Sequence, residues 1–282
     1  MIKPFLQDDE LLSNINQGNP NPTDFRLWWL GQSGFLIQWR GNHLLFDPYL
    51  SDSLTLKYAQ TDKPHIRMTE RAVNPMRLNF IDVVTSSHNH TDHLDAATLI
   101  PLISVNPDIN LVIPEANREF VCDRINCDHE FPVGMNDQLS KKVGDFLFHG
   151  IPAAHNDLSR DDNGNCHYMG FIVQFGSWTI YHSGDTLWYP GMEDILSPFA
   201  PDLAILPING NKPERRVAGN LDHQEAPKLA KAIGAKVVIP CHYQMFTFNT
   251  ADVEDFVTAS EQIGQPYQVL QCGEPWSSEV IV

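Results

Sequence analysis

The amino-acid sequence predicts an α/β fold with two mixed β-sheets and helices outside them, in one domain that spans residues 1–282. Hydrophobic residues make up 42% of the chain and charged residues 19%, an ordinary globular composition with enough apolar surface for a sizeable core. Both halves of the chain open with hairpin-like apolar runs and continue with alternating strand and helix patterns. No internal repeat, low-complexity tract or linker separates the halves.

The first half is predicted to begin as a β-meander. Its three apolar, β-rich runs are separated by the turn-forming stretches GQSG and RGN and cover 26–30, 34–39 and 43–48. The run IDVVTSS (81–87) ends in small polar residues, which is typical of a buried strand that leads into a functional loop. A helix is expected over 94–103, followed by a strand and a helix within 110–125.

The second half has the same character. Strands are expected within 143–155, 168–185, 201–208 and 235–243, and helices within 221–235 and 251–264. Several of these strands end close to a histidine or an aspartate, so polar side chains follow the strands at the point where they lead into loops.

Charge and cysteine content narrow the function classes. The formal net charge is −16, from 35 acidic against 19 basic residues, which makes nucleic acid and anionic membranes poor candidate partners. The N-terminal stretch has no apolar run long enough for a signal peptide or a membrane span. Five scattered cysteines fit reduced thiols better than a disulfide framework. We therefore expect a cytoplasmic protein without membrane insertion.

The stretch SSHNHTDHLD (86–95) is the strongest chemical signal in the chain. Residues two apart on a strand point to one side, so His88 and His90 are predicted to face the same space. Asp92 and His93 follow on the turn into the next helix. Neutral imidazoles and a carboxylate are ligands for zinc, manganese or iron. The alternative, surface histidines with Asp92 capping the helix, leaves three clustered histidines unexplained.

Three further candidate ligands follow other predicted strands. His155 comes after an apolar strand, Asp185 lies in a Ser-Gly-Asp turn, and His242 ends the run VVIPCH. Each one alone is an ordinary polar loop residue. The four residues of the first loop cannot complete a two-metal site, and these three together supply the missing ligands.

The order of these motifs resembles the metallo-β-lactamase superfamily, from about Leu27 to His242. The resemblance implies a four-layer αββα sandwich with a binuclear site at one edge of the two sheets. It implies a first metal on His88, His90 and His155, a second on Asp92, His93 and His242, and Asp185 as a bridge between them. It also implies two divalent ions, zinc or manganese foremost and iron also compatible, with a shared hydroxide as nucleophile.

Two branches of the superfamily are similar to this chain. WWLGQSGFLI followed by LLFDPYLS looks like the opening of the ascorbate-6-phosphate lactonase branch. N-acyl-phosphatidylethanolamine phospholipase D has a first motif of the same character as residues 88–95. The acidic charge and the lack of a membrane-binding helix speak against the phospholipase, so a lactonase-like hydrolase is expected. Diiron flavoproteins of this fold carry Glu where this chain has His90, which argues against oxygen or nitric oxide reduction.

The loop 209–220 is the candidate substrate-binding segment. It holds Lys212, Arg215 and Arg216, and arginine binds phosphate or carboxylate in bidentate geometry, so the small-molecule substrate is expected to be anionic. The alternative is a solvated loop whose charges serve solubility. A leaving group is expected to receive its proton from the side of Asp92 or of His223, although His223 fits a structural role equally well.

Three residues are candidates for orienting the ligands by hydrogen bonds: Asp47, His182 and His167. The other histidines, His43, His65, His129 and His149, are predicted to have no functional role. No Gly-x-Ser-x-Gly elbow or nucleotide-binding glycine loop occurs in the chain.

Three functions stay open at this point. The first is a binuclear metal-dependent hydrolase acting on a small lactone or ester such as a sugar-phosphate lactone. The second is a phosphodiesterase acting on a lipid-like or cyclic phosphodiester. The third is a non-catalytic metal-binding or sensing protein, against which the full set of seven candidate ligands counts.

Overall fold

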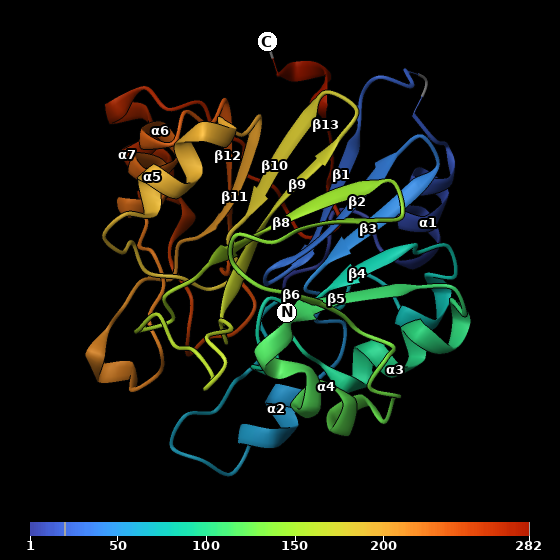
Figure 1. The fold of residues 1–282 in the computed structure, drawn as a ribbon. Helices are drawn as coiled ribbons and strands as arrows, with labels where there is room; N and C mark the ends of the chain where they lie inside the picture. Colours follow the sequence, from blue (N-terminus) through green and yellow to red (C-terminus); the bar gives the residue numbers. More distant parts are fainter. Residues whose placement is uncertain (20, 282) are drawn as a thin grey trace.

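A computed structural model of the chain describes residues 1–19 and 21–281. Two mixed β-sheets pack against each other and carry helices on their outer sides, so the layers run helix, sheet, sheet, helix (Figure 1). The strand order is β13-β1-β2-β3-β4-β5-β6 in the first sheet and β12-β11-β10-β9-β8-β7 in the second. The predicted αββα sandwich is confirmed.

The first sheet has an antiparallel part and a parallel part. β1 to β3 form the predicted meander, and β13 pairs antiparallel with β1. From β3 onward the pairing with β4, β5 and β6 is parallel. The strands are β1 Arg26–Gly31, β2 Gly34–Trp39, β3 Asn42–Phe46, β4 Val83–Thr85, β5 Asn110–Pro114, β6 Val133–Met135 and β13 Pro275–Ser277.

The second sheet repeats this plan. β7 to β10 pair antiparallel, and β10, β11 and β12 pair parallel. The strands are β7 Ser140–Val143, β8 Phe146–Pro152, β9 Met169–Phe175, β10 Trp178–His182, β11 Leu203–Pro207 and β12 Val237–Cys241.

The helices connect these strands or flank the sheets. They are α1 Asp8–Asn16, α2 Ser53–Tyr58, α3 Ala96–Val105, α4 Arg118–Ile125, α5 Met192–Leu196, α6 Glu225–Ala232 and α7 Val253–Ile263. Short 3₁₀ turns cover Pro75–Arg77, Glu115–Asn117, Ser197–Phe199, Pro213–Arg215 and Ser278–Val280. Within the described residues no helix is long and apolar enough to cross a membrane.

The core lies between the two sheets, and a second apolar layer lies under the helices. Every residue of β2 is buried, because the other sheet covers one face and helices cover the other. Phe25 links the sheets by packing edge-on against Phe175 and Trp178, with ring centroids 5.5 Å and 5.3 Å apart. Burial of such a ring stabilises the fold by roughly 1.5–3 kcal/mol.

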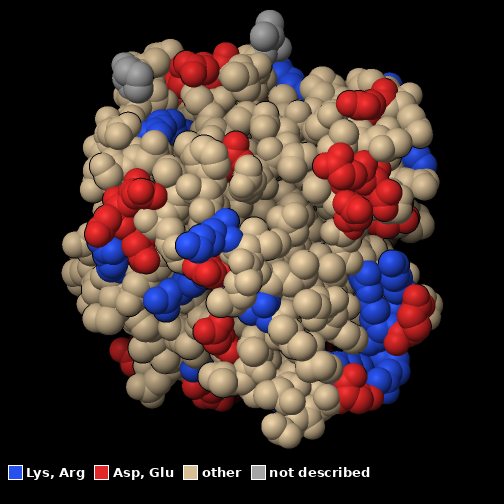
Figure 2. Space-filling model, turned by 180° about the vertical axis from the view of Figure 1, so that it is seen from behind, with Lys and Arg blue, Asp and Glu red and all other residues tan. Residues whose placement is uncertain are grey.

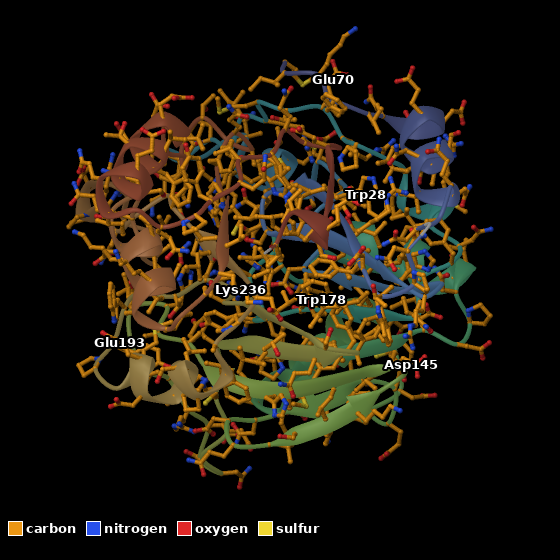
Figure 3. The ribbon with its side chains drawn as sticks, turned by 90° about the horizontal axis from the view of Figure 1, so that it is seen from above. Trp28, Glu70, Asp145, Trp178, Glu193 and Lys236 are labelled. Atoms are coloured by element: carbon orange, nitrogen blue, oxygen red, sulfur yellow. The ribbon has the colours of Figure 1, made fainter. Side chains whose placement is uncertain are left out.

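The view from above shows the same layering. Trp28 of β1 lies beside α1 and donates a hydrogen bond to Asn14 Oδ1 at 3.0 Å (Figure 3). Glu193 and Asp145 lie at opposite sides of the molecule in this view. These two charged residues thus lie on the outside of the molecule.

The strands and helices predicted from the strong apolar patterns are present, with one correction at a helix start. Asp95, and not Asp92, caps α3, because its side chain accepts a hydrogen bond from the Ala97 amide at 3.3 Å. The sequence does not predict the short elements α1, α2, α5, β6, β7 and β13. β13 shows why: its three residues form a strand only because Ser277 pairs with Arg26, far away in the chain.

Candidate metal centre

The seven candidate ligands follow four strands drawn from both sheets. The loop after β4 carries His88, His90, Asp92 and His93, and the loops after β8, β10 and β12 carry His155, Asp185 and His242. These loops meet at one place although they come from different sheets.

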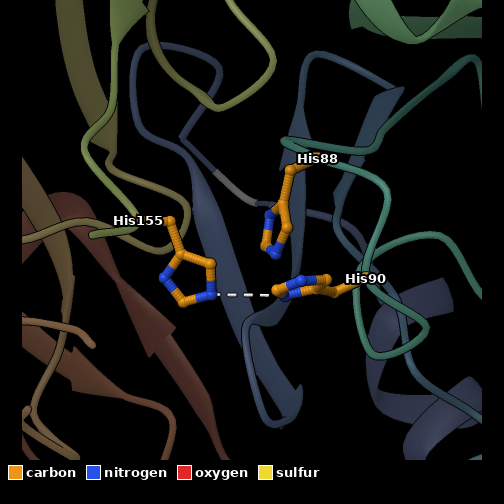
Figure 4. Close-up of side chains that lie close together, drawn as sticks. All are labelled: His88, His90 and His155. Atoms are coloured by element: carbon orange, nitrogen blue, oxygen red, sulfur yellow. Dashed lines mark hydrogen bonds between the residues drawn. The ribbon is translucent and has the colours of Figure 1, made fainter. Parts of the chain in front are cut away.

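The side chains form three overlapping groups, in each of which the candidate ligand atoms lie within 4.8 Å of one another. The groups are His88 with His90 and His155, His88 with His93 and Asp185, and Asp92 with His93 and His242. Figure 4 shows the first group, in which His155 Nε2 lies 3.2 Å from His90 Nδ1. Asp185 lies between the second and third groups. Its Oδ1 is 3.3 Å from His93 Nε2, and its Oδ2 is 3.4 Å from His242 Nε2.

Gly184 allows the Ser-Gly-Asp turn to approach the loop after β4. Its φ of +58° lies in the left-handed region, which glycine adopts without strain. A Cβ at this position would lie 2.6 Å from Ser87 Cβ and 2.7 Å from the Met169 carbonyl oxygen. A larger residue would therefore push Asp185 away from the histidines.

The buried polar atoms of the cluster fit a metal ion. His88 Nε2, His93 Nε2 and Asp185 Oδ1 are buried and have no hydrogen-bond partner among the described residues. Leaving such an atom unsatisfied costs about 1–3 kcal/mol, and a cation between the atoms would remove that cost. Imidazole and carboxylate donors suit zinc, manganese or iron. The cluster can therefore hold metal.

Opposite charges alternate within the cluster. Burial alone would raise the pKa of Asp185, but the charges of His93 and His242 outweigh burial and hold this pKa well below its ordinary range. Burial alone would lower the pKa of His242, but Asp185 and Asp92 raise it to about 9. The pKa of His90 falls to about 4 because of burial and the neighbouring His155. Metal binding would therefore displace protons from His93 and His242, so affinity would increase with pH.

Asp47 fixes the orientation of His93. Asp47 is fully buried at the turn after β3 and accepts a hydrogen bond from His93 Nδ1 at 2.7 Å. It also accepts hydrogen bonds from Thr85 Oγ1 at 2.6 Å and from the Ser87 amide at 3.1 Å. Because Nδ1 is engaged by the carboxylate, His93 Nε2 is left for the centre of the cluster.

Two further histidines are held in the same way. His155 Nδ1 donates to the Gly219 carbonyl at 2.9 Å, and His88 Nδ1 lies 3.0 Å from Ser87 Oγ. His155 Nε2 lies 3.7 Å from Asp185 Oδ2, and His88 Nε2 is buried with no hydrogen-bond partner among the described residues. The orientation of three of the imidazoles is thus set from outside the cluster.

His182 and His167 differ from the prediction. His182 Nε2 donates to the Ser33 carbonyl at 2.9 Å, and its ring stacks on Phe46 of the other sheet at a centroid distance of 4.7 Å. His167 Nδ1 lies 3.0 Å from Ser159 Oγ. Within the described residues neither ring hydrogen bonds a candidate ligand, because both rings are held by other parts of the fold.

A cavity of about 440 Å³ opens onto the cluster. The candidate ligands that line it are His90, Asp92, His155, Asp185 and His242. Arg216 also lines it, whereas Lys212, Arg215 and His223 do not. The predicted substrate-binding loop therefore reaches the cavity with one of its three cations.

Arg215 has a different role from the one predicted. Its guanidinium donates to the Asn209 carbonyl at 2.6 Å, to Asn249 Oδ1 at 2.9 Å and to the Thr250 carbonyl at 3.0 Å. These contacts hold the loop 209–220 to the segment that precedes α7. Lys212 is exposed, at the start of a 3₁₀ turn.

Two residues that the sequence does not predict to be functional lie close to the cluster. Gln32, in the predicted turn GQSG, donates from Nε2 to Asp92 Oδ2 at 2.8 Å, and the same nitrogen lies 2.9 Å from His242 Nε2. His65, predicted to be without function, lines the cavity. Neither position carries a local motif that would have identified it.

His65 is held firmly in that position. Its Nδ1 donates to the Lys63 carbonyl at 2.8 Å. Its ring packs against Tyr58, Phe246 and Phe248, with centroid distances of 4.4 Å, 5.3 Å and 5.3 Å. Burial lowers its pKa, so the ring is neutral near pH 7.

Relatives in sequence align with most of the chain. A UPF0173 metal-dependent hydrolase of Methanosarcina mazei is 26% identical over 247 residues, covering 84% of this chain and 91% of the relative. Another of Rubrobacter xylanophilus is 28% identical over 261 residues, covering 90% and 96%.

Solved structures agree in fold. Igni18, a metallo hydrolase from Ignicoccus hospitalis, has a TM-score of 0.65 at 23% identity and covers 90% of this chain and 98% of its own. An isothiocyanate hydrolase from Delia radicum gut bacteria has a TM-score of 0.69 at 18% identity, covering 89% and 98%. The family described as the beta-lactamase superfamily domain matches residues 26–242, a span that contains all seven candidate ligands. This chain therefore belongs to the beta-lactamase superfamily.

Proposed function

We propose that the protein is a binuclear metal-dependent hydrolase that acts on a small lactone or ester, such as a sugar-phosphate lactone. The observation that carries the proposal is the convergence of seven histidine and aspartate side chains, with unsatisfied buried atoms, at one end of a cavity. Relatives named metal-dependent hydrolases align with most of the chain, which supports the same reaction class.

The proposed ligand set divides between two positions: His88, His90 and His155 at the first, and Asp92, His93 and His242 at the second. Asp185 would bridge them, since its Oδ2 lies 3.7 Å from His155 Nε2 and 3.4 Å from His242 Nε2. Two bound divalent ions of zinc, manganese or iron would supply Lewis acidity and a hydroxide nucleophile at neutral pH.

The chain itself orients the ligands and shapes the reaction space. Asp47 and the Gly219 carbonyl keep the Nε2 atoms of His93 and His155 turned to the ligand cluster. Leu54, Phe120 and Val217 add apolar surface to the cavity. This arrangement leaves a confined, partly polar space next to the ligands.

His65 is the proposed proton carrier in place of His223. Its Nδ1 is engaged by a backbone carbonyl, so Nε2 is the nitrogen left to take and return a proton. The ring lines the same cavity as Asp92 and is held by aromatic neighbours, which fits a residue that moves a proton at the leaving oxygen.

A phosphodiesterase is the second candidate, because the cavity is lined by cations that would also suit a phosphodiester.

A panel of lactones, aryl esters and bis-aryl phosphates, assayed with protein reconstituted with zinc or manganese, separates the candidates. Turnover of lactones or esters with metal, lost on chelation and restored on metal addition, is expected. Preferred turnover of the phosphodiester would select the second candidate. Metal binding without turnover of any substrate would favour a non-catalytic metal-binding protein.

A further inference from the structure

We propose that the cavity selects small substrates that carry an anionic group, phosphate or carboxylate, through a cationic rim formed by Lys57, Lys63, Arg124 and Arg216. The proposal rests on the proposed hydrolase function and names the substrate class of that same cavity. All four residues line the cavity that opens onto the candidate metal ligands.

The cationic rim is assembled from three separate parts of the chain. Lys57 lies in α2 and Lys63 follows it, Arg124 lies in α4, and Arg216 lies in the loop 209–220. These parts are far apart in sequence, so the rim exists only in the folded chain. Of the three cations expected from the loop 209–220, only Arg216 belongs to it.

The charge around the cavity is opposite to that of the whole chain. The chain carries 35 acidic and 19 basic residues, yet four cations line this cavity. In the described part of the chain the carboxylates that line it are Asp92 and Asp185, both candidate metal ligands. With divalent ions bound, their charges would be more than neutralised, which would leave a positive cavity in an acidic protein.

Acidic and basic side chains are distributed differently elsewhere. On the face shown in Figure 2, Asp and Glu form several clusters with Lys and Arg nearby, and uncharged surface separates them. The cavity, which the described residues line with four cations and with no carboxylate beyond the candidate ligands, therefore differs in charge from the chain as a whole.

Most of the rim charge is free to act on a ligand. Among the described residues Lys57, Lys63 and Arg124 form no ion pair, and Arg216 pairs with the exposed Asp62. Lys63 Nζ donates a hydrogen bond to the Arg216 carbonyl, which links two residues of the rim. Lys57 Nζ lies 3.5 Å from Thr91 Oγ1 and 5.3 Å from the centre of the Tyr58 ring. The Lys57 ammonium group therefore has N–H donors left for a ligand beside its long contact with Thr91.

Arg124 offers a different geometry. It uses Nη1 for the Asn89 and Leu94 carbonyls, at 2.8 Å and 3.2 Å, and it packs over the Phe120 ring. The hydrogen bonds through Nη1 fix the planar group and leave its other nitrogens available for an oxyanion. The cationic rim thus combines a free ammonium group with a fixed guanidinium.

The rest of the lining limits the size and character of the substrate. A cavity of about 440 Å³ lies within the usual range for small-molecule sites. Leu54, Tyr58, Phe120 and Val217 provide apolar surface beside the rim. The substrate class is therefore a compact molecule with one anionic group at the rim and its hydrolysable bond toward the metal ligands.

The test compares Lys57→Met with Lys228→Met, a control at an exposed lysine of α6 that does not line the cavity. Each is assayed on a matched pair of substrates that differ by one phosphate or carboxylate. Lys57→Met is expected to raise KM for the anionic substrate about threefold to tenfold, with little change in kcat or in KM for the neutral one. The control is expected to leave both substrates unaffected.

Binding of inorganic phosphate, measured by titration calorimetry at low and high salt, gives a readout that needs no turnover. We expect binding that weakens with salt and is reduced in Lys57→Met but not in Lys228→Met. Equal phosphate binding in the two variants, or an equal KM change for both substrates, would overturn the cationic rim while leaving hydrolysis intact. Phosphate binding that depends on Lys57 without turnover of any substrate would support the rim and contradict the proposed hydrolase.

Discussion

The sequence predicts functional residues in two loops, each of which follows a strand, and in the structure only one of the two loops brings its predicted residues together. The loop 86–95 follows β4 and brings His88, His90, Asp92 and His93 into one cluster. The loop 209–220 follows β11, and its three cations separate, with only Arg216 reaching the cavity. The position of the side chains just after β4 is set by the buried strand. The position of the cations in the loop 209–220 is set instead by their own hydrogen bonds and ion pairs, as for Arg215 and Arg216.

Asp185→Asn is the change with the largest expected effect, because it tests whether the loop 86–95 needs a bridging charge from the other sheet. The variant is expected to lose at least one metal ion and to reduce kcat/KM by about a thousandfold or more. Elemental analysis and turnover measure this. Asp194→Asn, at an exposed aspartate of α5, is the control. Full metal content in Asp185→Asn would refute the bridge.

His65→Gln tests whether a residue outside both loops carries the proton in catalysis. If His65 carries the proton, kcat should fall by about a hundredfold, while the metal content stays unchanged. The pH profile of kcat should also lose one ionisation. His223→Gln provides the contrast, since His223 does not line the cavity and is expected to leave kcat within about twofold. Equal losses in the two variants would rule out the assignment to His65.

Asp47→Asn tests how the loop 86–95 is held. The variant removes the charged acceptor of His93 Nδ1 but keeps the shape of the side chain. Metal affinity is expected to fall about tenfold to a hundredfold. Competition with a chromophoric chelator measures the affinity. His167→Gln should leave it unchanged, because the His167 ring hydrogen bonds to Ser159. An unchanged affinity in Asp47→Asn would show that the orientation of His93 does not depend on the carboxylate.

Arg215→Met and Arg216→Met separate the structural role of the loop 209–220 from its role in substrate binding. Their expected effects are the smallest. Arg215→Met should reduce the free energy of unfolding by about 1–2 kcal/mol, because it removes the hydrogen bonds to Asn209, Asn249 and Thr250. Arg216→Met should leave stability nearly unchanged and raise KM for an anionic substrate severalfold. Urea denaturation and steady-state kinetics measure the two effects. The reverse pattern would contradict the structural description of the loop.

The sequence was most informative where local pattern and tertiary structure agree. Apolar runs placed the central strands, and the motif order implied an αββα fold and a ligand set whose seven side chains do converge. Asp47 was predicted because a carboxylate can fix the tautomer of a metal-bound imidazole.

The rest depends on contacts between distant parts of the chain. Lys57, Lys63 and Arg124 share a cavity with Arg216 only because α2, α4 and the loop 209–220 meet there. No local signal distinguishes His65, which lines the cavity, from His182, whose ring stacks on Phe46 between the sheets. β13 likewise becomes a strand only by pairing with β1.

Metal content per chain, measured by elemental analysis on protein purified without chelators, tests the central claim most directly. Convergence of seven ligands predicts about two zinc, manganese or iron ions per chain, removed by chelation and restored on metal addition together with hydrolysis. One ion or none, with no gain when metal is added, would contradict the binuclear centre.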